Sequence, residues 1–143
     1  MVKDTAERRL VRGQTGQSLA ELPIVLVLFL VVTFGIVDAA RLIYAYDVVS
    51  LSAREAVRYA VVRGSSSAHP ASVDDIKAVV QSKTVGVQVN TGDIDVTWEN
   101  PSTNDPGSTV VVTVRNTFSP IAPFPFVPKS IHLASTSKMV ISR

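Results

Sequence analysis

The stretch LPIVLVLFLVVTFGIV, residues 22–37, decides the fold of this chain. It carries no charge, and with residues 19–21 and 38–40 on either side it reaches the roughly 20 residues that a helix needs to cross a bilayer. The extended stretch includes Glu21 and Asp38 near its ends, so the run is only just long enough. We predict a membrane-spanning helix of marginal length.

A basic segment precedes this apolar run. It contains four basic residues against two acidic ones: Lys3, Arg8, Arg9 and Arg12 against Asp4 and Glu7. Lys and Arg are enriched on the cytoplasmic side of membrane proteins, so we expect a cytoplasmic N-terminus and an extracytoplasmic position after about residue 40. Two alternatives stay open here, a secretory signal cut near residues 37–39 and an anchor that is never cleaved.

The helical pattern continues beyond the apolar run, but the composition changes. Apolar residues recur on one side of a helix with a period near 3.6, and polar residues lie opposite. The apolar side consists of Leu42, Ala45, Tyr46, Val49, Ala53, Ala56, Val57 and Ala60. We therefore predict one helix from about residue 19 to 63, roughly 68 Å long at 1.5 Å per residue, with Gly64 as its C-cap. Residues 17–40 form its apolar half and residues 41–64 its amphipathic half.

For residues 65–143 we predict a small head of helix and strands that packs on the amphipathic half of the long helix. Ser72 and Asp75 have the spacing of a capping box for a short helix that begins near residue 72. Four strands are expected from alternating apolar residues, at 85–89, 93–98, 109–118 and 130–142, with residues 90–93 as a hairpin turn between the first two. The fold class is α+β: a long N-terminal helix on an antiparallel sheet of about four strands, with one short extra helix.

Composition argues against several functions. The net charge is only +2 and the basic residues are scattered, so nucleic-acid binding is not favoured. The chain has no cysteine, which excludes disulfides and thiolate metal sites. His69 and His132 stand in unrelated segments. Asp93 and Asp95 match no EF-hand spacing and are better explained as turn residues than as calcium ligands. We predict no catalytic site, no metal and no cofactor.

The proline-rich segment around residues 119–128 contains Phe124 and Phe126. Its prolines disfavour both a helix and a central strand. The two rings either cover the edge of the sheet as part of the core, which we favour, or form an exposed loop that binds a partner.

The N-terminal residues carry a family resemblance. Gly16 follows the basic leader, Glu21 is the fifth residue after that glycine, and a long apolar helix follows. The sequence from Gly16 to Gly64, with its Glu-Leu-Pro start, FGIVD exit and AREAVRYAVV continuation, resembles TadE-like proteins, the minor pilins or pseudopilins of tight-adherence (Tad/Flp) pili. Residues 119–140 resemble the end of the same family more loosely.

The resemblance implies a pilin-like fold and a specific maturation. The leader, residues 1–16, would lie in the cytoplasm, and a prepilin peptidase would cut after Gly16 and leave Gln17 as the new N-terminus. The subunit would first sit in the bacterial inner membrane with its head outside. It would then be packed through its helix into a pilus, with an inner-membrane platform protein and other pilin or pseudopilin subunits as partners. An uncleaved, membrane-anchored binding or adhesion module is the alternative.

Glu21 has two interpretations within this scheme. A carboxylate near the apolar end of a spanning helix costs free energy unless it is paired, and the α-amine of a neighbouring subunit's Gln17 would pair with it and set the axial register. Alternatively, Glu21 completes a capping box with Ser18, three residues earlier. Pro23 and Gly35 are the expected positions of a kink, because proline lacks a donor N–H and glycine has a low helix propensity.

Overall fold

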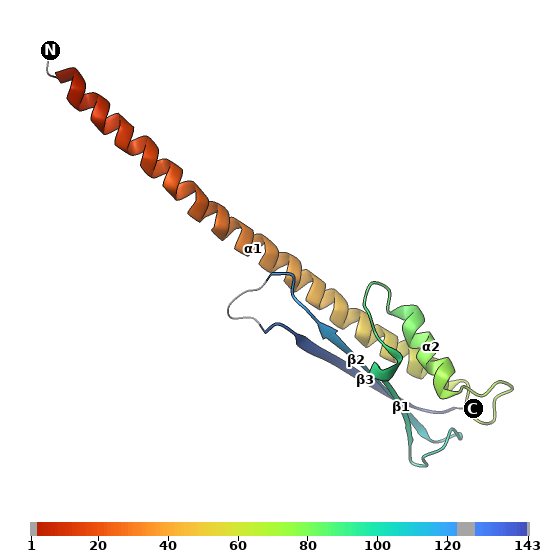
Figure 1. The fold of residues 1–143 in the computed structure, drawn as a ribbon. Coiled ribbons are helices and arrows are strands. Elements are labelled where there is room, and N and C mark those ends of the chain that lie inside the picture. Colours follow the sequence, from red (N-terminus) through yellow and green to blue (C-terminus); the bar gives the residue numbers. More distant parts are fainter. Residues whose placement is uncertain (1–2, 123–127, 143) are drawn as a thin grey trace. The chain divides into compact units, whose positions relative to one another are not determined.

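The computed structural model describes the backbone of residues 3–122 and 128–142, and the side chains of residues 20–122 and 128–142. Its first element is helix α1, Lys3–Val61. Helix α2, Val73–Lys83, a one-turn 3-10 helix η1, Thr91–Asp93, and strands β1, Ile94–Glu99, β2, Thr109–Phe118, and β3, Ile131–Val140, follow in that order (Figure 1). The chain divides into two compact units, residues 1–39 and residues 40–143.

Helix α1 extends further in both directions than a membrane span requires. It begins at Lys3, inside the basic leader, where we expected a start near residue 19. It ends at Val61, and the N–H of Arg63 donates to the carbonyl of Ala60, 3.0 Å away. Gly64 is therefore not the C-cap: among the described glycines, positive φ angles occur at Gly86 and Gly107. The last turn is closed by a local backbone bond, so no left-handed residue is required.

The second unit, which we call the head, has two layers. The sheet is antiparallel with the order β1-β2-β3, and β2 pairs along its whole length with β3. Residues 40–61 of α1 and helix α2 cover one face of this sheet (Figure 1). The fold class is thus α+β, as predicted, with three strands in the described part of the chain.

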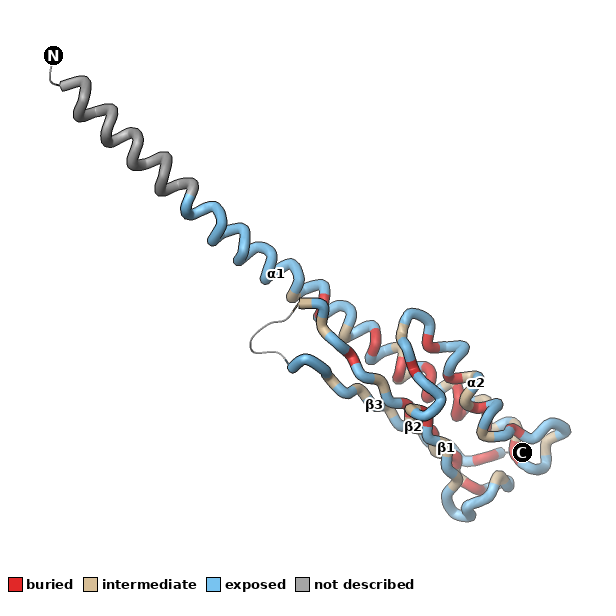
Figure 2. Tube along the Cα trace, viewed as in Figure 1, coloured by how far each residue is buried: buried red, intermediate tan, exposed pale blue. Residues whose placement is uncertain are grey.

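The core lies between these two layers (Figure 2). Alternate residues of β2 are buried, with Val110, Val112 and Val114 fully inaccessible. The facing stripe of α1 is made of small and β-branched residues: Val49, Ala53, Ala56, Val57 and Ala60. Small residues on the helix let its backbone approach the sheet closely. The amphipathic half of α1 thus packs as its sequence period predicted, except at Tyr46, which was expected on the apolar side and is 52% exposed.

Helix α2 begins as its sequence predicted. The N–H of Asp75 donates to Ser72 Oγ at 3.2 Å, and the N–H and Oγ–H of Ser72 donate to Asp75 Oδ2 at 3.0 and 2.7 Å. This reciprocal pair is a capping box and satisfies donors that the first turn of a helix leaves open. Ile76 and Val80 face the core from the next two turns.

The strand predicted at residues 85–89 is absent. The hairpin turn predicted at residues 90–93 is therefore also wrong. Gly86 has φ +75°, so the chain turns there instead of extending. Side chains from distant elements bind the backbone carbonyls of this segment: Tyr44 Oη donates to Val85 at 2.9 Å and Asn116 Nδ2 to Gln88 at 2.7 Å. Because side chains satisfy these two carbonyls, the segment folds as a loop. Residues 91–93 form η1, and Asn90, the residue before it, donates hydrogen bonds to Asp93.

Candidate assembly segment and head cleft

The apolar part of α1 presents its side chains outward. Large apolar side chains are exposed on all sides of the helix: Leu22, Ile24, Val25, Leu26, Val27, Leu28, Phe29, Leu30, Val31, Val32, Phe34, Ile36 and Val37 (Figure 2). The exposed fraction reaches 71% at Ile24 and stays at 63% at Phe29. A soluble monomer does not expose an apolar surface of this kind, so this surface requires an apolar partner or a bilayer.

This part of the chain also has the composition of a membrane span. Within the residues whose side chains are described, the helical segment Ala20–Val61 contains a window long and apolar enough to cross a membrane, and none of that window is buried. The absence of burial separates it from the core helix of a soluble protein, which passes the same test of length and composition. One N-terminal apolar helix therefore fits a single-pass anchor.

Glu21 lies on the exposed surface of α1 at the start of the apolar run. Helix α1 continues without a break on both sides of it, through Ser18 and through Pro23. Since the helix begins at Lys3, Ser18 is not the first residue of a helix in the full chain and cannot serve as its N-cap. The capping interpretation of Glu21 thus requires a chain that begins close to Ser18.

The other residues predicted to matter in this segment are Gly16, Gln17, Pro23 and Gly35, and the structure describes the side chains of only some of them. Gly16 and Gln17 lie in the helical backbone of α1, and their side chains are outside the described residues. Pro23 and Gly35 both lie inside α1, and a Cβ built on Gly35 would meet no atom within 4 Å. The open space at Gly35 means that close packing within the chain does not demand a glycine there. A kink at either position stays a prediction.

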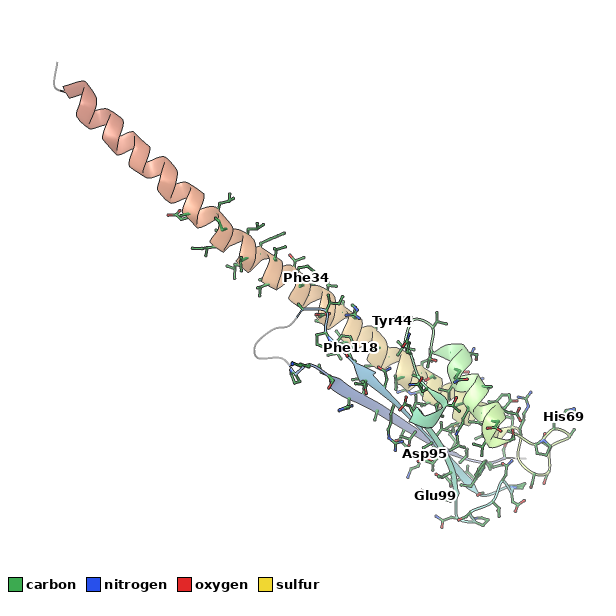
Figure 3. All side chains as sticks on the ribbon, in the orientation of Figure 1. Phe34, Tyr44, His69, Asp95, Glu99 and Phe118 are labelled. Atoms are coloured by element: carbon green, nitrogen blue, oxygen red, sulfur yellow. The ribbon has the colours of Figure 1, made fainter. Side chains whose placement is uncertain are left out.

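The head contains an open cleft of about 660 Å³ beside the start of its helical layer. Tyr44 from α1 and Phe118 from the end of β2, both labelled in Figure 3, line this cleft with Arg41, Gln88 and Asn116. The guanidinium of Arg41 lies 5.2 Å from the centre of the Phe118 ring, a cation–π distance. The cleft wall is therefore largely polar, with two aromatic rings and one exposed cation. No local sequence pattern indicates this cleft, because its walls come from three separated segments.

Of the polar residues considered as candidate chemical groups, Asp93 and His132 contact neighbouring polar groups, and Asp95 and His69 are exposed. Asp93 Oδ2 accepts from the backbone N–H and the Nδ2 of Asn90, both at 3.3 Å, so that oxygen serves the cap of η1. Asp95 is on the exposed face of β1 (Figure 3). His132 Nδ1 lies 3.2 Å from Thr117 Oγ1 on the neighbouring strand. His69 is exposed in the loop between α1 and α2. Among the described residues, no three His, Cys, Asp or Glu side chains are grouped to hold a metal ion.

Two carboxylates of the head have a perturbed pKa. The pKa of Asp75 is below its usual value, chiefly because the Ser72 hydroxyl donates to it and also because the Ser72 backbone N–H does. The pKa of Asp105 is lowered by a hydrogen bond from the Ser65 hydroxyl, at 2.5 Å, and by a second one from Thr103. Both groups tie a loop or a helix start in place. Neither lines the cleft.

Phe124 and Phe126, the predicted partner loop, are outside the described residues. Their described neighbours differ from each other: Phe118 is only 7% exposed, while Ile121 is 59% exposed. The choice between a core segment and a partner-binding loop at residues 124 and 126 therefore stays open.

Comparison with known proteins adds one match. Residues 16–58 match the family model of TadE-like proteins, so this segment of the chain is similar to that family. The matched segment begins at Gly16, includes Glu21 and the whole apolar run, and ends three residues before α1 does. No curated protein and no solved structure matches the chain.

Proposed function

We propose that the chain is a structural, pilin-like subunit of a Tad-type pilus or secretion assembly. The observation that supports this most is that the start of the TadE-like match and the start of the apolar helical surface lie close together. The TadE-like match begins at Gly16, and five residues later Glu21 marks the start of a helical surface that is apolar on all sides. A helix of this kind suits two successive surroundings, a bilayer before assembly and a bundle of equivalent helices afterwards.

Maturation would proceed at the N-terminal end of α1. The leader, residues 1–16, lies in the cytoplasm, a prepilin peptidase cuts after Gly16, and Gln17 becomes the N-terminus. The head, residues 65–143 with the second half of α1, stays on the outer side of the inner membrane. A platform protein in that membrane and other pilin or pseudopilin subunits are the partners, and the end state is a pilus at the cell surface.

Glu21 would be the residue that sets the register between subunits. An ionised carboxylate costs about 2.5 to 3.5 kcal/mol at the centre of a bilayer and less near its edge. The new α-amine of a neighbour's Gln17 offers a positive partner of the right kind, and it exists only after cleavage. An assembly held by this pair would therefore exclude unprocessed chains.

The proposal is tested by replacing Glu21 and following both processing and assembly. Glu21→Ala should be cleaved like the wild-type chain, while the amount recovered in sheared filaments falls several-fold. Glu99→Ala is the matched control, because Glu99 is an exposed carboxylate on β1 in the head. Normal assembly of Glu21→Ala would contradict the pairing role, and equal losses in both variants would point to a general effect of removing a negative charge.

A second candidate function is a membrane-anchored binding or adhesion module that is never cleaved. The observation in its favour is the open polar cleft of the head, which a purely structural subunit does not require. Substitution of Gly16 separates the two. If the chain is a pilin-like subunit, Gly16→Val should leave the leader attached and abolish assembly. If it is an anchored module, the wild-type chain and Gly16→Val should both keep the leader, and the substitution should not change binding to cells.

A further inference from the structure

One end of the head exposes apolar side chains next to a cation. We call the set Arg41, Tyr44, Val85 and Ile121 the cleft-end surface. Val85 is 72% exposed, Ile121 59% and Tyr44 52%, and Arg41 is also exposed. A single exposed apolar residue is ordinary, but Tyr44 and Val85 are joined by a hydrogen bond, and Ile121 is three residues after Phe118, whose ring Arg41 covers.

A hydrogen bond and a cation–π contact fix parts of this surface. Tyr44 Oη donates to the carbonyl of Val85 at 2.9 Å, which fixes the loop at residues 85–86 against α1. A Cβ on Gly86 would lie 3.6 Å from Tyr44 Oη, so the loop is in contact with this ring. Arg41 lies over the ring of Phe118. Phe118 is three residues before Ile121 in the chain. The exposed apolar side chain of Val85 is therefore held at a defined place beside the cleft.

Chain connectivity limits how far this surface can be from the apolar run. Arg41 is four residues after Val37, the last residue of the run. Even a fully extended chain covers at most about 14 Å in four residues, whatever the arrangement of the two units. The headgroup layer on each side of a bilayer is about 5 to 7 Å thick. If the run spans a membrane, Arg41 lies in the headgroup layer or just outside it.

We propose that the cleft-end surface lies on the outer leaflet of the membrane while the subunit waits in the bilayer. This inference rests on the proposed membrane-anchored subunit. The Arg41 guanidinium would bind a lipid phosphate, for which its planar donors are suited. Tyr44 would lie at headgroup depth, where aromatic rings are enriched, and Val85 and Ile121 would enter the top of the acyl region. The lipid surface would then fix the orientation of the head before assembly, and release from the bilayer would uncover the cleft.

The absence of cysteine from the chain makes this testable with single labels. Val85→Cys, Val62→Cys and Phe29→Cys variants of the full chain, each labelled with the fluorophore NBD, are inserted into vesicles of phosphatidylethanolamine and phosphatidylglycerol. Val62 is the matched control: it is apolar and 54% exposed, and it follows α1 about 30 Å along the helix from Arg41. Lipids with a doxyl quencher near the top of the acyl chain report contact at residues 85 and 62, and lipids with the quencher near the end of the acyl chain report contact at residue 29, which lies in the middle of the apolar run.

The expected result is that NBD at residues 85 and 29 loses most of its fluorescence to the quencher, while NBD at residue 62 keeps it. Quenching at residue 29 but not at residue 85 would overturn the docking inference and leave the anchor standing. No quenching at residue 29 would overturn the anchor and the docking together. NBD that is shielded from water at residue 85 but not quenched by the lipid label would mean that another protein covers this surface, which also contradicts the inference.

A second variant tests the phosphate contact. Arg41→Gln in the Val85→Cys background should reduce quenching at residue 85, and the same change in the Phe29→Cys background should have no effect. Full quenching at residue 85 in the Arg41→Gln variant would overturn the role assigned to the guanidinium.

Discussion

The two units of this molecule share one helix but treat its apolar side chains in opposite ways. In residues 20–37 the large side chains point outward, and Leu22 and Phe29 are 66% and 63% exposed. In residues 40–61 the apolar stripe is made of small residues, and Val49 and Val57 are completely buried against the sheet. The same backbone geometry thus supports one segment that completes its own core and one that needs apolar surroundings from outside.

Folding and assembly should therefore depend on different parts of helix α1. The head buries its apolar surface within the chain, so its stability should depend on its own packing. The apolar run gains nothing from the described part of the chain, so its substitutions should act on insertion and assembly. The following predictions test that separation in descending order of expected effect.

The largest contrast is expected from one charge placed in each unit. Val57→Asp buries an unpaired carboxylate in the core and should lower the free energy of unfolding of the head by about 3 to 5 kcal/mol or more. Val31→Asp should leave that free energy unchanged and instead oppose membrane insertion by about 2.5 to 3.5 kcal/mol. Urea unfolding of both chains in detergent, followed by Trp98 fluorescence, and fractionation of membranes give the two readouts. Loss of head stability in Val31→Asp would break the separation.

A cavity in the head should cost less than a charge. Ile76→Ala removes a fully buried side chain from α2 and should destabilise the head by about 2 to 5 kcal/mol. Leu51→Ala is the control, since Leu51 lies on α1 with 54% of its surface exposed, and its change should stay within about 0.5 kcal/mol. Urea midpoints of the two variants decide the matter. An equal shift for Leu51→Ala would mean that a partner covers that side chain.

Glycine substitutions should act with opposite sign in the two units. Gly86→Ala forces a Cβ into a positive-φ conformation and should cost the head about 1 kcal/mol. Gly35→Ala meets open space and should favour the helix by about 1 kcal/mol, visible as an increase in helical circular dichroism on heating. A loss of assembly in Gly35→Ala despite its gain in helicity would show that the filament uses a kink or a close helix contact at this position.

The smallest effect concerns the capping box of α2. Ser72→Ala should cost about 1 kcal/mol at neutral pH because it removes the acceptor for the Asp75 N–H. The folded-state pKa of Asp75 is below its ordinary value of 3.8, so its contribution to stability is present above pH 4 and is lost as the pH falls through the folded pKa. Urea unfolding between pH 6 and pH 2 should therefore show a smaller loss in Ser72→Ala than in the wild type. Parallel curves would exclude this coupling.

Sequence reasoning succeeded where the signal was local. The bounds of β2 and the capping box of α2 follow from alternation and from a spacing of three residues, and both are confirmed. The strand predicted at residues 85–89 was wrong because the contacts that decide its structure are not local. Its alternating valines are typical of a strand, but Tyr44 and Asn116, 41 and 28 residues away from the carbonyls they bind, hold it as a loop. Such distant hydrogen bonds leave no periodic pattern in the sequence.

The candidate sites also differ in whether a local sequence pattern indicates them. Gly16 and Glu21 are identified through the family resemblance that their spacing carries, and the TadE-like match covers both positions. The early start of α1 at Lys3 was missed, because the leader is charged and the apolar run on which the prediction was based begins only near residue 19. The cleft was also missed, since Arg41, Gln88 and Asn116 meet only when the sheet closes on the helix.

The account depends most on whether the apolar run is released from its leader, and sequencing the N-terminus of the protein recovered from cells answers this directly. The account predicts a mature chain that begins at Gln17, with the cut directly after Gly16. A chain that keeps the basic leader and remains in the inner membrane would contradict the assembly role and leave α1 as a permanent anchor.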